Sequence, residues 1–164
     1  MFTRIKNNPA RATIRLPRLG KIRLGIKKIA KSGAEYPAEV DYFVVPPEVQ
    51  AKFGEKPKTL MVMIPTEDEE KVLRQYYAVY GSNQKLLCQG DGQDAERRID
   101  GKIEKMACPG PKDCEFAKDP KRPDKLRCAA RTDVMVVLPT VNMGGVYQIS
   151  TGSINSDIDI RSGL

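Results

Sequence analysis

The chain has 164 residues, of which 40% are hydrophobic and 30% charged, and its formal net charge is +7. This length and composition are typical of one soluble globular domain and argue against a disordered or membrane protein. No apolar run approaches the roughly 20 residues that a membrane-spanning helix needs. The N-terminus shows no signal-peptide pattern either, so we expect the protein to stay in the compartment where it is made.

The positive charge is concentrated at the N-terminus. Residues 1–34 contain ten Lys and Arg side chains and no Asp or Glu, whereas the rest of the chain has 18 basic against 21 acidic residues. Residues 1–19 show no hydrophobic period, and we interpret them as a basic arm. Such a segment is expected to contact nucleic-acid phosphate or an acidic protein surface. The alternative is a solvated arm that only keeps the protein soluble.

A half-buried strand is predicted to begin after Gly20. Apolar residues at 22, 24 and 26 alternate with Lys21, Arg23, Gly25 and Lys27, which is the period of a strand with one buried face. The other face would be a row of cations with a glycine gap where a partner backbone could approach. The candidate residues for binding a partner or nucleic acid are the cations of this strand and of the end of the arm: Arg15, Arg18, Lys21, Arg23, Lys27 and Lys28.

The following segments predict most of a sheet. Short apolar or alternating runs bounded by Pro, Gly or polar residues are typical of strands, and they occur at 40–45, 59–64, 85–92, 94–99, 134–139 and 144–151. The two runs at 85–92 and 94–99 are expected to form a hairpin with a glycine-rich turn. A helix of at most two turns is expected at 48–54, and another is expected to start near Ser153.

The strongest helix signal is the stretch TEDEEKVLRQYYAVYG. Thr66 and Glu69 have the spacing of a capping box, and Gly81 stands where a helix C-cap is expected. These features predict one well-defined helix at about 67–80, with its tyrosines in the core and not on a base-stacking platform. The predicted fold class is therefore α+β, with a mixed, mainly antiparallel sheet in a single domain over residues 20–164.

Four cysteines and no histidine define the candidate metal site. Cys88, Cys108, Cys114 and Cys128 are separated by 19, 5 and 13 residues. The insert at about 88–128 is rich in Pro, Lys and Asp around the last three cysteines, so it is not expected to hold its shape by burial alone. A Zn²⁺ ion bound by four thiolates would stabilise it and, with no open coordination position, would be structural. Unrelated buried thiols and disulfides are the alternatives.

No catalytic motif is found. The chain has no GxxxxGK[ST] phosphate loop, no GxSxG elbow and no GxGxxG after a strand, and it lacks the histidine that serves most often as a general base. We therefore expect that the protein is not an enzyme.

The order of several short blocks carries a family resemblance. The blocks are GKIRLGIKK, YPAEVDYFVVPPE, FGEKPKTLMVMIP, a tyrosine-rich segment, LLCQGDGQDAER, the cysteine-rich insert and VMVVLPTVNMGGVYQISTGSINS. In this order they resemble the phage recombination directionality factors that partner large serine integrases, together with their relatives in mobile elements. The resemblance extends over nearly the whole chain from Gly20.

The resemblance implies a non-catalytic accessory protein in the cytoplasm of a bacterial host cell. Such a protein would bind a serine integrase already seated on DNA and favour excision over integration, and DNA would be contacted directly or through the integrase. Two other functions stay open from the residues alone: a stand-alone DNA- or RNA-binding protein, and a subunit of a larger nucleoprotein machine.

Overall fold

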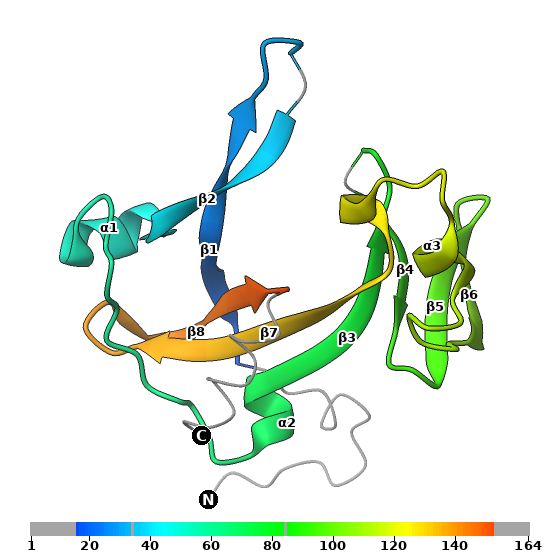
Figure 1. Ribbon diagram of the computed structural model, residues 1–164. Coiled ribbons are helices and arrows are strands. Elements are labelled where there is room, and N and C mark those ends of the chain that lie inside the picture. Colours follow the sequence, from blue (N-terminus) through cyan, green and yellow to red (C-terminus); the bar gives the residue numbers. More distant parts are fainter. Residues whose placement is uncertain (1–15, 34, 84, 153–164) are drawn as a thin grey trace, which may run out of the picture.

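The computed structural model describes residues 16–33, 35–83 and 85–152. Within these ranges, eight strands form one sheet in the order β2-β1-β8-β7-β3-β4-β5-β6 (Figure 1). The strands are β1 (Arg18–Ile29), β2 (Glu35–Val44), β3 (Leu73–Tyr80), β4 (Leu86–Gly90), β5 (Asp94–Ile99), β6 (Lys102–Ala107), β7 (Ala129–Leu138) and β8 (Asn142–Thr151). The helices are short: α1 (Pro47–Phe53), α2 (Glu69–Val72), α3 (Glu115–Lys118) and the 3₁₀ turn η2 (Asp124–Leu126).

Most neighbouring strands are antiparallel. Among the described strands, the one parallel pair is β1 with β8, which joins the first strand of the chain to the last. A mixed, mostly antiparallel sheet with few helices confirms the predicted α+β class. In the described part of the chain no helix is long and apolar enough to cross a membrane.

The β1–β2 hairpin extends away from the rest of the sheet (Figure 1). Residues 18–22 of β1 pair with β8, whereas residues 25–29 pair only with residues 35–39 of β2. We call residues 25–29 and 35–39 the hairpin arm. Because neither strand of the arm pairs with a third described strand, both outer edges of the arm carry backbone groups without a strand partner.

The sheet carries two separate apolar clusters. The first gathers buried side chains of β1, β3, β7, β8, α1 and α2 around Tyr147, which is fully buried and donates a hydrogen bond from its hydroxyl to Glu48 of α1 (3.3 Å). The second lies at the other end of the sheet, where Val79, Ala95, Cys88 and Cys108 are buried together. The cysteine insert predicted from the sequence therefore packs into this second, smaller apolar cluster.

The predicted helix at 67–80 is wrong. Only Glu69–Val72 is helical, and the chain continues as strand β3 between β4 and β7. The Thr66 hydroxyl accepts a hydrogen bond from the backbone N–H of Asp68 (3.2 Å), so it forms a local turn and does not cap Glu69. The run of Tyr and Val from Tyr76 onward has a high strand propensity, and pairing on both sides stabilises it as a strand.

The predicted buried strand at 59–64 is also wrong. This segment is irregular, with a single bridge in which Met63 and Val137 exchange two backbone hydrogen bonds of 2.9 Å. All four side chains of residues 61–64 are exposed. The predicted strands at 40–45, 134–139 and 144–151 and the hairpin at 85–99 are present, as is the short helix after Pro46. The helix expected near Ser153 and arm residues 1–15 lie outside the described residues.

Candidate functional site

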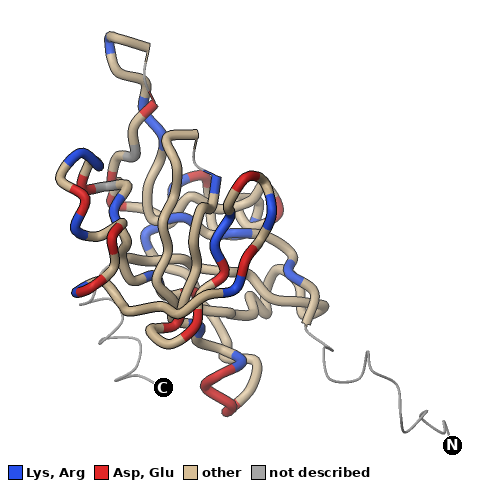
Figure 2. Tube along the Cα trace, turned by 90° about the vertical axis from the view of Figure 1, so that its right-hand side faces the viewer, with Lys and Arg blue, Asp and Glu red and all other residues tan. Residues whose placement is uncertain are grey.

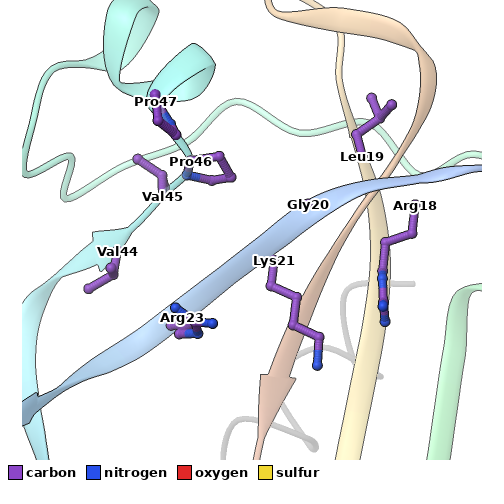
Figure 3. A pocket seen from close by; sticks show the side chains of 9 residues that line it. All are labelled: Arg18, Leu19, Gly20, Lys21, Arg23, Val44, Val45, Pro46 and Pro47. Atoms are coloured by element: carbon purple, nitrogen blue, oxygen red, sulfur yellow. The ribbon is translucent and has the colours of Figure 1, made fainter.

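A groove runs along the start of β1, opposite the junction of β2 and α1. Its volume is about 580 Å³. Cations of β1 form one side and apolar residues form the other (Figure 3): the lining is Arg18, Leu19, Gly20, Lys21, Arg23, Val44, Val45, Pro46 and Pro47. Figure 3 shows the side chains of Arg18 and Lys21 extending from β1 in the same direction, away from Leu19. We call this feature the β1 groove. It brings together three of the predicted binding residues.

Arg18 also has a structural role. Its guanidinium donates to the side-chain oxygen of Gln148 (2.7 Å), and Gln148 donates to the hydroxyl of Ser150 (3.0 Å). Ser150 donates in turn to the carboxylate of Asp133 (2.6 Å), which also accepts from Tyr76 (3.2 Å). This polar chain crosses four strands, so Arg18 is held in place at the edge of the groove.

Lys27 and Lys28 lie outside the groove, on the hairpin arm. Lys27 forms an exposed ion pair with Glu35 (3.2 Å). The register pairs Gly25 with Glu39 and Ile29 with Glu35, so two carboxylates share the face of Lys27. This face therefore carries both signs of charge, and is not an unbroken row of cations. Arg15 lies outside the described residues.

The glycine gap on β1 is closed by the chain itself. A Cβ at Gly25 would stand 2.8 Å from the carbonyl oxygen of Ala38 on β2, because the β1–β2 register shifts between Arg23 and Gly25. The missing side chain at Gly25 therefore lets β2 approach β1 closely, and it leaves no space for the backbone of a partner.

Exposed apolar side chains accompany the charges of the arm. Ile29 is 73% exposed and Tyr36 41% exposed, and Leu24, just before the arm, is 37% exposed. The sequence analysis did not single out Tyr36 or Ile29, because the apolar alternation ends at Ile26 and Ile29 falls on the opposite face. Figure 2 shows basic and acidic positions interspersed along the folded chain. The arm thus presents a mixed apolar and charged surface, which is typical of protein interfaces.

The four cysteines meet at the second apolar cluster. Cys88 comes from β4, Cys108 and Cys114 come from the turn after β6, and Cys128 comes from the residue before β7. All four line one small cavity of about 10 Å³, and none forms a disulfide. Three of them are buried and Cys128 is partly buried. The fold therefore brings together the four residues that the sequence analysis singled out.

Backbone hydrogen bonds hold the cysteine turn. The N–H of Cys108 donates to the carbonyl of Gln93 (2.7 Å), which ties the turn to the β4–β5 hairpin. The N–H of Cys114 donates to the carbonyl of Gly110 (2.9 Å), and α3 starts directly after Cys114. Burial, followed by the nearby Cys114, raises the pKa of the Cys128 thiol to about 12. The Cys128 thiol is therefore uncharged at neutral pH.

Arg97 is the cation that lines the cavity together with the four cysteines. It pairs directly with Cys88 across β4 and β5. Its guanidinium stacks on the Phe116 ring at 4.4 Å and forms an ion pair with Glu115. Burial lowers the pKa of Arg97, but its interactions with Cys88 and Glu115 outweigh that effect and raise it. The Nε of Arg97 is buried without a hydrogen-bond partner.

Within the described ranges, no three Cys, Asp or Glu side chains are already arranged as a metal site. The zinc site predicted from the sequence therefore stays a prediction, although its four residues are neighbours.

Over residues 19–164 the chain matches the family described as Gp3-like: Recombination directionality factor-like. The match covers most of the chain, so the protein belongs to this family, as the block order of the sequence indicated. No curated protein and no solved structure matches the chain.

Proposed function

We propose that the protein is a non-catalytic factor that binds a serine integrase on DNA and shifts recombination from integration towards excision. The observation that carries the proposal is the family match over residues 19–164, which covers all of the described strands except Arg18, the first residue of β1. Membership of a family does not by itself fix a function. The proposed contact surface therefore rests on the β1 groove and the hairpin arm.

The proposed mechanism is a linkage effect. A serine integrase bound to DNA can pair its attachment sites in more than one arrangement, and a factor that binds one arrangement more tightly shifts the equilibrium towards it. A shift from 1:99 to 99:1 needs about a 10⁴-fold difference in affinity between the two arrangements. The factor needs no catalytic group for this role.

The β1 groove and the hairpin arm are the proposed contact surface. Lys21 and Arg23 offer positive charge beside the apolar wall of Val44 and Pro46. Exposed Tyr36 and Ile29 add apolar surface that a phosphate backbone would not use. This combination favours an acidic, partly apolar protein surface over bare DNA as the partner. An acidic surface on the integrase would fit it.

The test is a recombination assay with a serine integrase from the same mobile element. The purified protein should promote recombination between the two product junction sites and inhibit recombination between the two original attachment sites. No effect on either reaction, with integrase shown to be active alone, would overturn the proposal.

Direct DNA binding is the second candidate, because the β1 groove is lined by three cations. A salt titration of binding to bare DNA separates the two candidates. A direct DNA binder loses affinity steeply with salt, in proportion to the phosphates that it neutralises. We expect weak binding to bare DNA at low salt and strong binding to the integrase–DNA complex.

A further inference from the structure

We propose that Cys88, Cys108, Cys114 and Cys128 bind one structural Zn²⁺ ion as thiolates, with Arg97 as the positive charge beside them. This proposal is independent of the proposed function, because it concerns only how the segment between β6 and β7 is held.

The fold brings the four cysteines to one place. The four cysteines come from three separate parts of the chain, yet all four line one cavity of about 10 Å³. That volume is close to the space of a single water-sized sphere. Four soft sulfur ligands around a space of this size fit Zn²⁺ in tetrahedral coordination, at about 2.3 Å from each sulfur.

The other side chains that bind zinc in proteins are histidine and carboxylates, and here they are absent from the sequence or engaged in ion pairs. The chain contains no histidine. The two carboxylates that flank Cys114 are each engaged in an ion pair, Asp113 with Lys118 (3.2 Å) and Glu115 with Arg97. The thiols are therefore the available ligands in this cavity.

The segment between β6 and β7 also buries little apolar surface of its own. Residues 108–128 contain only α3 and the 3₁₀ turn η2, each of three or four residues. Among the described side chains of this segment, the buried ones are Cys108 and Cys114. A segment with so little buried apolar surface needs a cross-link, and a metal bound by both of these cysteines provides one.

Arg97 offers a positive charge and an unused donor atom at this site. Its buried Nε lacks a hydrogen-bond partner among the described residues, although it stands beside Cys88. Four thiolates around one Zn²⁺ carry a net charge of −2. An outer-shell guanidinium would compensate part of this charge and donate to a ligand sulfur.

Binding requires no oxidant or reductant. Each thiol transfers its proton to solvent and its sulfur lone pair forms a bond to Zn²⁺, so loading the site releases up to four protons. The oxidation states of sulfur and zinc stay unchanged.

The experiment measures metal and thiols on the same sample of wild-type protein, purified under reducing conditions without added zinc. Elemental analysis should give one zinc per chain. Alkylation under native conditions should modify none of the four cysteines, and alkylation after a strong chelator should modify all four. A folded, reduced sample without zinc that also takes up none when Zn²⁺ is added would overturn the proposal, and so would two disulfides in the protein as isolated from cells.

Substitutions of the cysteines and of Arg97 distinguish a loss of zinc binding from a loss of folding. Cys128→Ser should lose zinc, whereas Cys128→His should keep it, because Cys₃His is a common zinc ligand set. Arg97→Gln should bind zinc roughly 10–100-fold more weakly, the usual effect of losing an outer-shell partner. Asp113→Asn is the matched control and should bind zinc as wild type does. If Cys128→Ser and Cys108→Ser both stay folded and keep one zinc, then the assignment of the ligands is wrong.

Discussion

The hydroxyl of Tyr76 on β3 donates a hydrogen bond to the carboxylate of Asp133 on β7, with 3.2 Å between the two oxygens. The two residues are diagonal neighbours, because Tyr76 pairs with Arg131 in the register. Burial and the charge of Asp133 raise the pKa of Tyr76 well above its usual value. Asp133 is 6% exposed, so this buried carboxylate depends on the donors that the sheet supplies.

Tyr76→Phe should destabilise the domain by about 1–3 kcal/mol, because it removes one donor from a buried charged acceptor. Ser150 still donates to Asp133, which keeps the effect moderate. Chemical denaturation followed by circular dichroism measures the change. Tyr77→Phe is the control: the Tyr77 hydroxyl has no hydrogen bond within the described part, so its removal should cost less than about 0.5 kcal/mol. Equal effects of the two variants would contradict this role of Asp133.

Gly90→Ala should destabilise the cysteine end of the sheet. A Cβ at position 90 would stand 2.6 Å from Sγ of Cys108 and 2.9 Å from the carbonyl oxygen of Asp94. The expected cost is about 1–3 kcal/mol, the usual range for overpacking a tight site. Gly81→Ala in the same hairpin is the matched control, because its tightest contact is the flexible side chain of Asn83 at 3.0 Å. Denaturation curves of both variants test the difference.

Arg122 should be required to hold the cysteine segment against β3. Its guanidinium donates to the carbonyls of Tyr80 (3.1 Å) and Leu126 (2.9 Å) and stacks on Phe116 at 4.9 Å. Arg122→Ala should therefore speed hydrogen exchange in residues 108–128 and lower stability by about 1–3 kcal/mol. Arg122→Lys should restore only part of the protection, because an ammonium cannot reproduce the planar fork. Unchanged exchange in Arg122→Ala would show that the segment is held by other contacts.

The sequence predicted the strands that alternate or that end at Pro and Gly, because these signals are local. It failed at residues 67–80, where helix and strand signals compete. The acidic first turn of α2 does form a helix, but the pairing of β3 with both β4 and β7 decides the rest. That pairing involves residues far away in the chain, which no local pattern reports.

The candidate site, like the fold, could be predicted from the sequence only in part. The spacing of the cysteines and the absence of histidine identified a set of residues that the fold brings to one cavity. Arg97 was missed, because its place opposite Cys88 follows from the β4–β5 register and not from a motif. On β1, the alternation located Lys21 and Arg23 but could not show that β2 brings Glu35 and Glu39 onto the face of Lys27.

The cations of the β1 groove should matter for partner binding more than those of the arm. Lys21 and Arg23 line the groove, whereas Lys27 is paired with Glu35. Lys21→Glu combined with Arg23→Glu should weaken binding to an integrase–DNA complex by at least about tenfold, because like charges would then face an acidic surface. The free energy of unfolding should change by no more than about 0.5 kcal/mol per exposed substitution.

A matched charge reversal tests whether position or net charge matters. Lys102→Glu combined with Lys105→Glu makes the same change on β6, at the opposite end of the sheet. This control should bind the complex nearly as wild type does at the same salt concentration. If both pairs weaken binding equally, the effect is one of net charge and the β1 groove has no specific role. If neither pair weakens it, the groove is only a solvated edge of the sheet, and the proposed contact surface is wrong.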